Sequence, residues 1–490
     1  MLYVNIKLQK YFRNIKNFVV IRNNDKSGVL RLKSINRGFV FKAVKWIAAI
    51  YLMYFFTFGI IIFNFNNDRD FETPFNISMI ESSNDEVLLL EEPINALRHR
   101  ISLIRQAATS IDIACFSLSN DHSSRIIVLE ILKAADRGVE ISAIFDGIMH
   151  GFRGDKKGAL HLLVKHPNIR VSFYEPFSIT KPWVIQNRLH DKYLIVDNQY
   201  VIVGGRNIGD RYFIPGFSSD FTYDRDILVK RNSSESVIDD ISLYFSSLWN
   251  FKGSKELLYN SNYIQDKVVD KYLESTVESI ALIEKKYPVI FESTCHSKFH
   301  EVDSIKLIHN PLQRFNKEPW VLHEINELLK KENEPVLIKT PYIILTNRML
   351  KEFDVINDLE VEVITNSREI SPNLFAIAGY LNNKGKIVDN ISPIHKYNGE
   401  GALHGKSLLV GDLITVIGTY NFDPRSTFLS TESMLIIESR ELNEDIRFYA
   451  NKHKLDSVDV KDMDYEGIPI AKRLVIFILR ILLYPFTNML

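Results

Sequence analysis

An internal duplication dominates the sequence of this 490-residue chain. The segment RLHDKYLIVDNQYVIVGGRN at residues 188–207 recurs as ALHGKSLLVGDLITVIGTYN at residues 402–421. In both copies, Lys follows His by two residues, Gly follows it by 14 and Asn follows it by 17. The chain is therefore expected to contain two copies of one structural unit.

The surrounding secondary-structure patterns repeat as well. The first half reads strand, helix, strand over residues 111–147, and the second half repeats this order over residues 335–367. Strands that alternate with helices predict largely parallel sheets covered by helices. We expect an α/β fold of two halves related by pseudo-twofold symmetry, each a mostly parallel sheet flanked by helices, with the active site at their junction.

Both copies carry the same polar residues in an otherwise apolar setting. The shared set is His190, Lys192, Gly204 and Asn207 in the first copy, and His404, Lys406, Gly418 and Asn421 in the second. On a strand, side chains at i and i+2 point to one face, so each His should project beside its Lys. The Gly permits close approach of the backbone where the Asn side chain meets the site.

These residue types suit attack on a phosphodiester. A neutral imidazole is a nucleophile toward phosphorus, while Lys and Asn offset charge on the phosphoryl oxygens. A second imidazole can protonate the leaving oxygen and then deprotonate the incoming nucleophile. A single His on a strand is more often a plain core or surface residue, but recurrence of the whole set favours function. No metal or cofactor is expected, because each pair places a cation, not a second ligand, beside its His.

The arrangement resembles the phospholipase D superfamily, in which an HxKx4D motif occurs twice per active site. Residues 190–207 match it fully, including Asp197, with GGRN where many members have GSxN. The second copy departs, because Gly411 stands at the position of the motif Asp and Asp412 follows one residue later. In the family this Asp mainly supports local structure, so its loss is expected to affect the stability of the second motif more than its chemistry.

The resemblance also implies a carboxylate that fixes the tautomer of each His. Asp226 lies 36 residues after His190, and Glu432 lies 28 residues after His404, and each is predicted to pair with its own His. The alternative is that both are ordinary carboxylates at strand edges. By the usual family order, His190 is the expected nucleophile and His404 the general acid and base.

A closer similarity is to bacterial cardiolipin synthases of the C type, carried by AADRGVEISAIFD, by LHDKYLIVDNQYVIVGGRNIGDRYF and by YNFDPRS. It runs from about residue 93 to the C-terminus and implies a phosphatidyltransferase. Such an enzyme passes a phosphatidyl group through a phosphohistidine to a phospholipid head-group hydroxyl. Phosphatidylglycerol is the expected substrate, with phosphatidylethanolamine as a further candidate donor.

Other activities stay open: a phospholipase D that hydrolyses phospholipids, a nuclease of the same superfamily, or a catalytically silent membrane scaffold. Lys plus Arg and Asp plus Glu both number 60, so no excess positive charge is present to neutralise a nucleic acid. No nucleic acid partner is therefore expected. The two cysteines are too few for a disulfide framework and leave the compartment undecided.

A membrane anchor is indicated near the N-terminus. Residues 46–63 contain no charge and are long enough to span a bilayer. Residues 1–45 carry 11 Lys or Arg and one acid, whereas residues 66–93 carry eight acids and one Arg. The positive-inside rule then predicts a single-pass protein of the bacterial inner membrane, with a cytoplasmic N-terminus and a periplasmic body.

A second apolar run, at residues 474–486, follows Lys472 and Arg473 and is too short to span a bilayer. Its composition favours a helix in the membrane interface, and the alternative is a helix packed on the body. The expected organisation is a basic cytoplasmic segment (1–45), a transmembrane helix (46–65), an acidic linker (66–92), two phospholipase D-like halves (93–300 and 301–466) and a C-terminal interface helix (467–490).

Overall fold

The structure is a computed structural model that describes residues 37–65, 71–75, 84–258, 266–294, 297–459 and 469–490. It divides into two units, residues 1–57 and residues 58–490. In the first unit, residues 1–36 of the predicted basic segment lie outside the described residues. Helix α2 (Arg37–Gly59) contains most of the predicted anchor, and the stretch Val40–Asn64 is long and apolar enough to cross a membrane.

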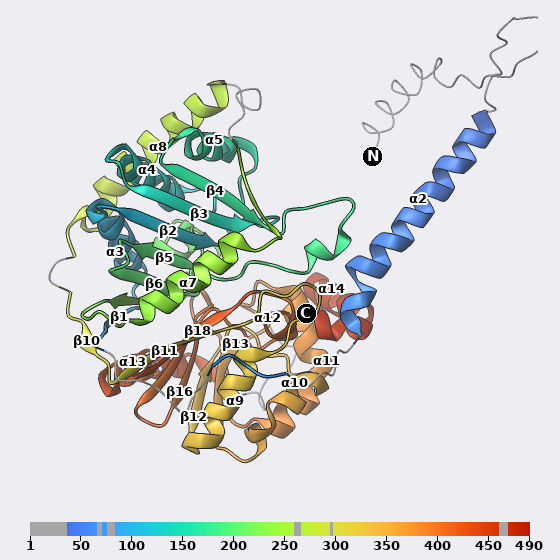
Figure 1. Cartoon of the computed structure of the whole chain (residues 1–490). Helices are drawn as coiled ribbons and strands as arrows, with labels where there is room; N and C mark the ends of the chain where they lie inside the picture. The colour runs from blue at the N-terminus through green and yellow to red at the C-terminus, as the bar shows by residue number, and fades with distance from the viewer. Residues whose placement is uncertain (1–36, 66–70, 76–83, 259–265, 295–296, 460–468) are drawn as a thin grey trace, which may run out of the picture. The chain divides into compact units, whose positions relative to one another are not determined.

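The first half is built on a nine-stranded sheet of order β10-β1-β8-β6-β5-β2-β3-β4-β9 (Figure 1). Its strands are β1 (Glu86–Leu90), β2 (Ser110–Cys115), β3 (Glu140–Asp146), β4 (Ile169–Tyr174), β5 (Tyr193–Val196), β6 (Tyr200–Gly204), β8 (Asp226–Lys230), β9 (Ser254–Glu256) and β10 (His300–Glu301). Helices of this half are α3 (Pro93–Gln106), α4 (His122–Asp136), α5 (Lys157–Lys165), α6 (Asp210–Phe213), α7 (Val237–Asn250) and α8 (Asp266–Lys286). Strand β1 lies within the stretch that the sequence analysis assigned to the acidic linker.

The second half is built on an eight-stranded sheet of order β11-β18-β17-β16-β12-β13-β14-β19. Its strands are β11 (Ser304–His309), β12 (Val336–Lys339), β13 (Val361–Asn366), β14 (Ile394–Tyr397), β16 (Lys406–Val410), β17 (Ile414–Gly418), β18 (Ser433–Glu438) and β19 (Ser457–Asp459). Its helices are α9 (Trp320–Glu332), α10 (Asn347–Glu352), α11 (Leu374–Asn390), α12 (Pro424–Phe428), α13 (Arg440–Leu455) and α14 (Ile470–Leu483).

The two sheets confirm the predicted duplication. From β1 to β9 in the first half, and from β11 to β19 in the second, eight strands follow the same spatial order. The prediction of mostly parallel sheets is wrong, however. Only β2-β3-β4 and β12-β13-β14 are parallel, and the other neighbours are antiparallel. The motif hairpins β5-β6 and β16-β17 lie at the middle of each sheet and impose antiparallel pairing there.

The inner faces of the two sheets share one apolar core. Residues from both sheets meet in it, including Ile144 and Val203 from the first and Ile364 and Leu435 from the second. Helices α7 and α13 complete this core, while α3, α4, α5 and α8 cover the outer face of the first sheet. The halves are therefore packed against each other through buried apolar surface, which fixes the relative position of the two motif hairpins.

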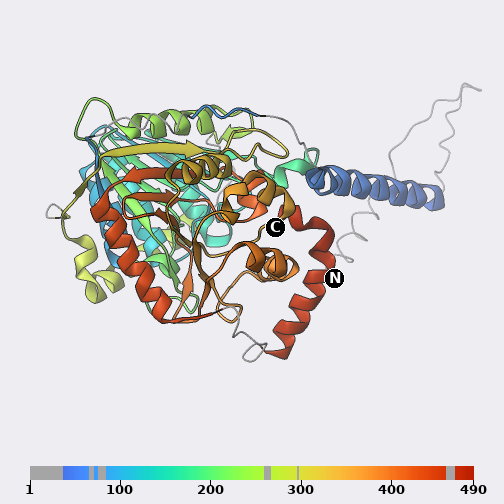
Figure 2. The same cartoon turned by 90° about the horizontal axis from the view of Figure 1, so that it is seen from below.

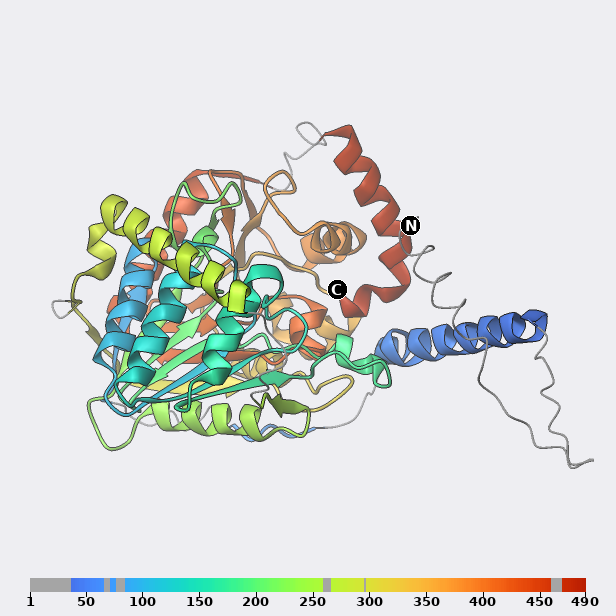
Figure 3. The same cartoon turned by 90° about the horizontal axis from the view of Figure 1, so that it is seen from above.

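The C-terminal helix α14 packs across α11 on the surface of the second half (Figures 2 and 3). Lys472 Nζ donates hydrogen bonds to the carbonyls of Arg368 and Glu369, at 2.8 and 3.1 Å. Ile476 is buried against the body. One face of the helix is thus packed on the body, and its opposite face leaves apolar side chains exposed. Contact of that face with the membrane interface stays a prediction.

Candidate active site

Each motif His lies just before the first strand of a tight hairpin. His190 precedes β5, His404 precedes β16, and both hairpins turn through three residues. The turn begins with a residue in the left-handed region, Asp197 with φ +52° in the first hairpin and Gly411 with φ +52° in the second. Asp and Gly both tolerate this conformation, so the two turns keep the same backbone path.

The contacts of Asp197 show why Gly411 can stand at the position of the motif Asp in the second copy. The Asp197 carboxylate accepts hydrogen bonds from the backbone N–H groups of Ala108, Thr109 and Ser110 at 2.8 to 2.9 Å. Ser110 corresponds to Pro335 in the second half, because Asp197 N donates to Ser110 O and Gly411 N donates to Pro335 O. Proline has no N–H to offer, so a carboxylate at Gly411 would lack one of these donors.

Asp412 does not make the contacts that the missing motif Asp would make. Its side chain is 76% exposed and lies 3.6 Å from the Arg447 guanidinium. Arg447 also donates a hydrogen bond to the carbonyl of Gly411 at 2.5 Å, so helix α13 supports the turn from the other side. The second hairpin is therefore stabilised by different contacts, and its strand pairing is intact.

The two His side chains pair with carboxylates of the opposite half. His190 Nδ1 lies 2.9 Å from Glu432 Oε2, and His404 Nδ1 lies 2.5 Å from Asp224 Oδ2. Since a carboxylate only accepts, Nδ1–H of each ring donates and Nε2 keeps its lone pair. The imidazoles are only 13% and 14% exposed, so these pairs are largely shielded from water.

The predicted pairing of each His with the carboxylate of its own half is wrong. Asp226 is fully buried and binds two arginines instead, with its Oδ2 at 2.8 Å from Arg100 Nη2 and 2.9 Å from Arg206 Nη1. Glu432 was identified correctly as a His partner, but it serves His190 and not His404. Asp224, which the sequence analysis missed, is the partner of His404.

Short parallel strand contacts between the halves place each His beside a carboxylate of the other half. Leu189 bridges to Thr431, one residue before His190 and Glu432 respectively. In the reciprocal contact, β15 (Ala402–Leu403) pairs with β7 (Thr222–Tyr223), one residue before His404 and Asp224. The same geometry thus occurs twice, as the predicted pseudo-twofold relation requires.

The lysines lie beside the imidazoles and are almost fully buried. Lys192 Nζ donates to the His190 carbonyl at 2.5 Å, and Lys406 Nζ lies 2.7 Å from His404 Nδ1. Burial and the charges of Lys192 and Lys406 hold the pKa of His190 well below its usual value. Burial and the Lys406 charge lower the pKa of His404 to about 3. Both imidazoles are therefore neutral at physiological pH before a ligand binds.

Burial also changes the ionisation of the partner groups. It lowers the pKa of Lys406 to about 7 and raises the pKa of Glu432 to about 7. Burial alone would raise the pKa of Asp224, but the contact with His404 and the charge of Lys406 outweigh it and bring that pKa well below its ordinary value. An anionic group placed among these residues would restore positive charge to the lysines.

The two motif asparagines complete the polar surface. The Oδ1 atoms of Asn207 and Asn421 are buried and accept no hydrogen bond from any residue in the described part of the chain. Asn207 Nδ2 donates to the Tyr212 hydroxyl at 3.2 Å. Because amide orientation is set by available partners, these groups can reorient toward phosphoryl oxygens. Within the described ranges, no group of three His, Cys, Asp or Glu side chains is arranged to hold a metal ion.

Glycines shortly before both motif asparagines leave room for neighbouring groups that a Cβ would displace. A Cβ on Gly204 would lie 2.5 Å from Asp226 Cα, and one on Gly418 would lie 2.2 Å from Ser433 O, so each allows the next strand to approach. A Cβ on Gly205 would lie 2.2 Å from Asp224 Oδ1. Gly205 thus makes room for the carboxylate that holds His404.

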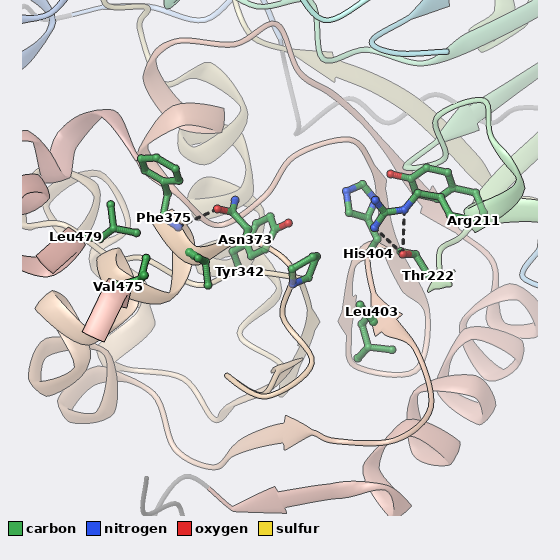
Figure 4. Close-up of a pocket in the computed structure, with 13 residues that line it drawn as sticks. Arg211, Thr222, Tyr342, Asn373, Phe375, Leu403, His404, Val475 and Leu479 are labelled. Carbon is green, nitrogen blue, oxygen red and sulfur yellow. Dashed lines mark hydrogen bonds between the residues drawn. The ribbon is translucent and has the colours of Figure 1, made fainter. Parts of the chain in front are cut away.

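A cavity of about 590 Å³ opens beside His404 (Figure 4). Arg211 and Thr222 lie next to the imidazole, and Arg211 Nη2 donates to Thr222 Oγ1 at 2.9 Å. The far wall is apolar and includes Phe375, Val475 and Leu479. The cavity has the size of a small-molecule site, with one polar and one apolar end.

The chain is similar in sequence to known bacterial proteins. Residues 101–249 and 325–454 match the family described as "Cardiolipin synthase, PLD-like domain". A protein of Helicobacter pylori strain J99 without an assigned function is 27% identical over 424 residues, covering 76% of this chain and 79% of that one. Cardiolipin synthase C of Escherichia coli K12 is 26% identical over 412 residues, covering 74% of this chain and 84% of that one.

A solved structure has the same fold. Phosphatidylserine synthase of Haemophilus influenzae Rd KW20 superposes with a TM-score of 0.59 at 15% sequence identity, covering 82% of this chain and 95% of that one. The superposition spans both halves of the chain, in agreement with the duplicated architecture.

Proposed function

Because this chain belongs to the phospholipase D-like cardiolipin synthase family and is an enzyme of that superfamily, we propose that it is a membrane-anchored phosphatidyltransferase. The reaction joins a phosphatidyl group to the head-group hydroxyl of phosphatidylglycerol and yields cardiolipin. The observation that carries the proposal is the pair of reciprocal His–carboxylate contacts, each next to a buried Lys. They supply two differently placed imidazoles for one two-step reaction.

The first step forms a covalent intermediate. His190 Nε2 attacks the phosphorus of the donor lipid, and the bond from phosphorus to the head-group oxygen breaks. His404 Nε2 gives a proton to that oxygen, which leaves as glycerol or ethanolamine. Without a ligand the pKa of His404 is about 3. Protonation of His404 therefore depends on the bound substrate phosphate, whose negative charge beside the imidazole raises that pKa.

The second step returns the enzyme to its starting state. His404 takes the proton from the hydroxyl of the acceptor phosphatidylglycerol, whose oxygen attacks the phosphohistidine and displaces His190. Lys192, Lys406 and the two motif asparagines bind the phosphoryl oxygens through both steps. Glu432 holds the His190 ring and stabilises the charge that it acquires on phosphorylation.

Incubation of the full-length protein with vesicles of labelled phosphatidylglycerol tests this proposal. We expect labelled cardiolipin and free glycerol in equal amounts, and added phosphatidylethanolamine should release ethanolamine if it also serves as donor. The reaction should proceed in EDTA, since the proposed chemistry uses no metal. Phosphatidic acid as the sole lipid product would instead identify a hydrolase, because water attacks the same intermediate.

The proposed location is the bacterial inner membrane, with the N-terminus in the cytoplasm and the body in the periplasm. The excess of basic residues before position 46 and of acidic residues after position 65 supports this orientation. A reporter that is active only outside the cytoplasm, fused after Pro93, is expected to be active. Activity of a cytoplasmic reporter at the same junction would reverse the orientation.

The pH dependence of turnover should reflect the two groups with a pKa of about 7. Catalysis requires Glu432 ionised, which is lost as pH falls, and Lys406 protonated, which is lost as pH rises. We therefore expect kcat/KM on a soluble short-chain lipid to follow a bell with its maximum near pH 7.

Two variants assign the limbs of this bell. Glu432→Gln should lower the rate and abolish the acidic limb, and Lys406→Arg should shift the alkaline limb to higher pH because guanidinium keeps its charge. An acidic limb that persists unchanged in Glu432→Gln would show that ionisation of Glu432 does not cause it.

A further inference from the structure

Helix α14 exposes an apolar surface that its packing does not use. One side is fastened to α11, since Arg480 Nε donates to Asn382 Oδ1 at 3.1 Å and Asn382 Nδ2 donates to the Arg480 carbonyl at 3.0 Å. The other side carries apolar residues whose side chains are 46 to 61% exposed: Leu474, Phe477, Ile478, Ile481 and Leu482. A continuous apolar strip of this kind marks an interaction surface.

The strip lies beside the point where the body continues into the candidate membrane helix. Asn64 Nδ2 donates to the carbonyl of Pro485 at 2.7 Å, which joins the segment after the apolar helix to the segment after α14. Phe63 and Met489 are buried in the same apolar cluster of the second half. An anchor that spans a bilayer would therefore bring this part of the body to the membrane surface.

The same helix forms a wall of the cavity beside His404. Val475 and Leu479 project into the cavity from α14, and Phe375 projects from the start of α11 (Figure 4). His404, Arg211 and Thr222 lie at the opposite end. The exposed strip and the apolar end of the cavity thus belong to two neighbouring faces of one helix.

We infer that the cavity receives the acyl chain and glycerol backbone of a phospholipid that leaves the bilayer along α14, with Val475 and Leu479 in contact with the chain. A chain that moves from the bilayer onto this apolar wall stays out of water. Arg211, which also forms an ion pair with Asp220 at 2.8 Å, lies at the end of the cavity that receives the phosphate of the same lipid. This inference rests on the proposed function, and it adds the path and the residues that contact the chain.

Chain-length dependence provides the functional test. Val475→Trp and Leu479→Trp place an indole in the cavity, while Ile470→Trp places one at the exposed first residue of the same helix, outside the strip. In full-length protein, the two cavity variants should lower kcat/KM for dipalmitoyl phosphatidylglycerol at least about tenfold relative to dihexanoyl phosphatidylglycerol, because remote binding energy is lost. Ile470→Trp should leave that ratio unchanged. Equal ratios in all three variants would overturn the inference.

Photocrosslinking separates the inference from the proposed reaction, because it needs no turnover. Full-length His190→Ala protein is mixed with vesicles that contain phosphatidylglycerol with a diazirine near the ester end of one chain. We expect adducts on the peptides of Phe375, Val475 or Leu479. Adducts confined to the exposed strip would show docking on the bilayer without use of the cavity and would overturn the inference. If cavity adducts form but the native protein makes no cardiolipin, only the proposed reaction is contradicted.

Discussion

The His190→Ala protein is expected to lose at least about 10⁴-fold in turnover, because no other group in the site can form the covalent intermediate. His404→Ala should lose about 10²–10⁴-fold, the usual contribution of a general acid and base. Both side chains are largely shielded and hydrogen-bonded to a carboxylate of the other half, so neither can take the position of the other.

A donor with a good leaving group distinguishes the two roles. A p-nitrophenyl ester of phosphatidic acid needs no proton on its leaving oxygen. Release of nitrophenol in the first turnover should therefore recover in His404→Ala but not in His190→Ala. Recovery in His190→Ala alone would exchange the assigned roles. The thermal unfolding of both variants, measured in the same detergent, controls for loss of folded protein.

The second large effect is expected from Asp224→Asn, with a loss of about 10²–10⁴-fold in turnover. The amide cannot hold Nδ1–H of His404 as the carboxylate does, so the ring loses the tautomer that leaves Nε2 free to carry the proton. The pairing across the halves makes this residue of the first motif region a partner of the second His.

Asp226→Asn is the matched control, because the same chemical change is made two residues away. Among the described residues, the Asp226 side chain binds Arg100 and Arg206 and no imidazole. Turnover per folded molecule should therefore be close to that of the native protein. Stability should fall by about 3–5 kcal/mol, since Arg100 and Arg206 lose a buried counter-ion. If Asp226→Asn abolishes turnover while the folded fraction is unchanged and Asp224→Asn is active, the pairing described above is wrong.

Most of the active site could be predicted because its signal lies in short, local spacing. The offsets of Lys, Gly and Asn from each His are fixed by one hairpin, in which strands of five residues or fewer are joined by a three-residue turn. A pattern that repeats within a hairpin survives insertions elsewhere in the chain. The two-half architecture followed from the same repeat, and the comparisons confirm the family that it resembles.

The His–carboxylate pairing could not be predicted from spacing, because it joins residues 180 and 242 positions apart. A better alignment would nevertheless have identified Asp224. Gly204 pairs with Asp226, and Gly418 pairs with Met434, so these two partners are equivalent. The residues two positions before these equivalent partners are Asp224 and Glu432.

The sheet arrangement and the C-terminal helix were harder for a different reason. Strands buried on both faces look alike in parallel and antiparallel sheets, so only the hairpin turns carried information about direction. Residues 474–486 have the composition of an interface helix, yet Lys472 binds backbone carbonyls of the body. That contact depends on the loop before α11, which no local pattern in α14 encodes.

Identification of the covalent adduct shows whether the reaction passes through His190. The p-nitrophenyl donor is mixed with His404→Ala protein, in which the first step proceeds and the second lacks its base. Rapid quenching at neutral or alkaline pH, followed by peptide mapping, should locate a phosphatidyl group on His190. Two results would contradict a reaction through phosphorylated His190. One is an adduct on His404 in the corresponding His190→Ala experiment, with none on His190 in His404→Ala. The other is release of nitrophenol in His404→Ala with no histidine adduct.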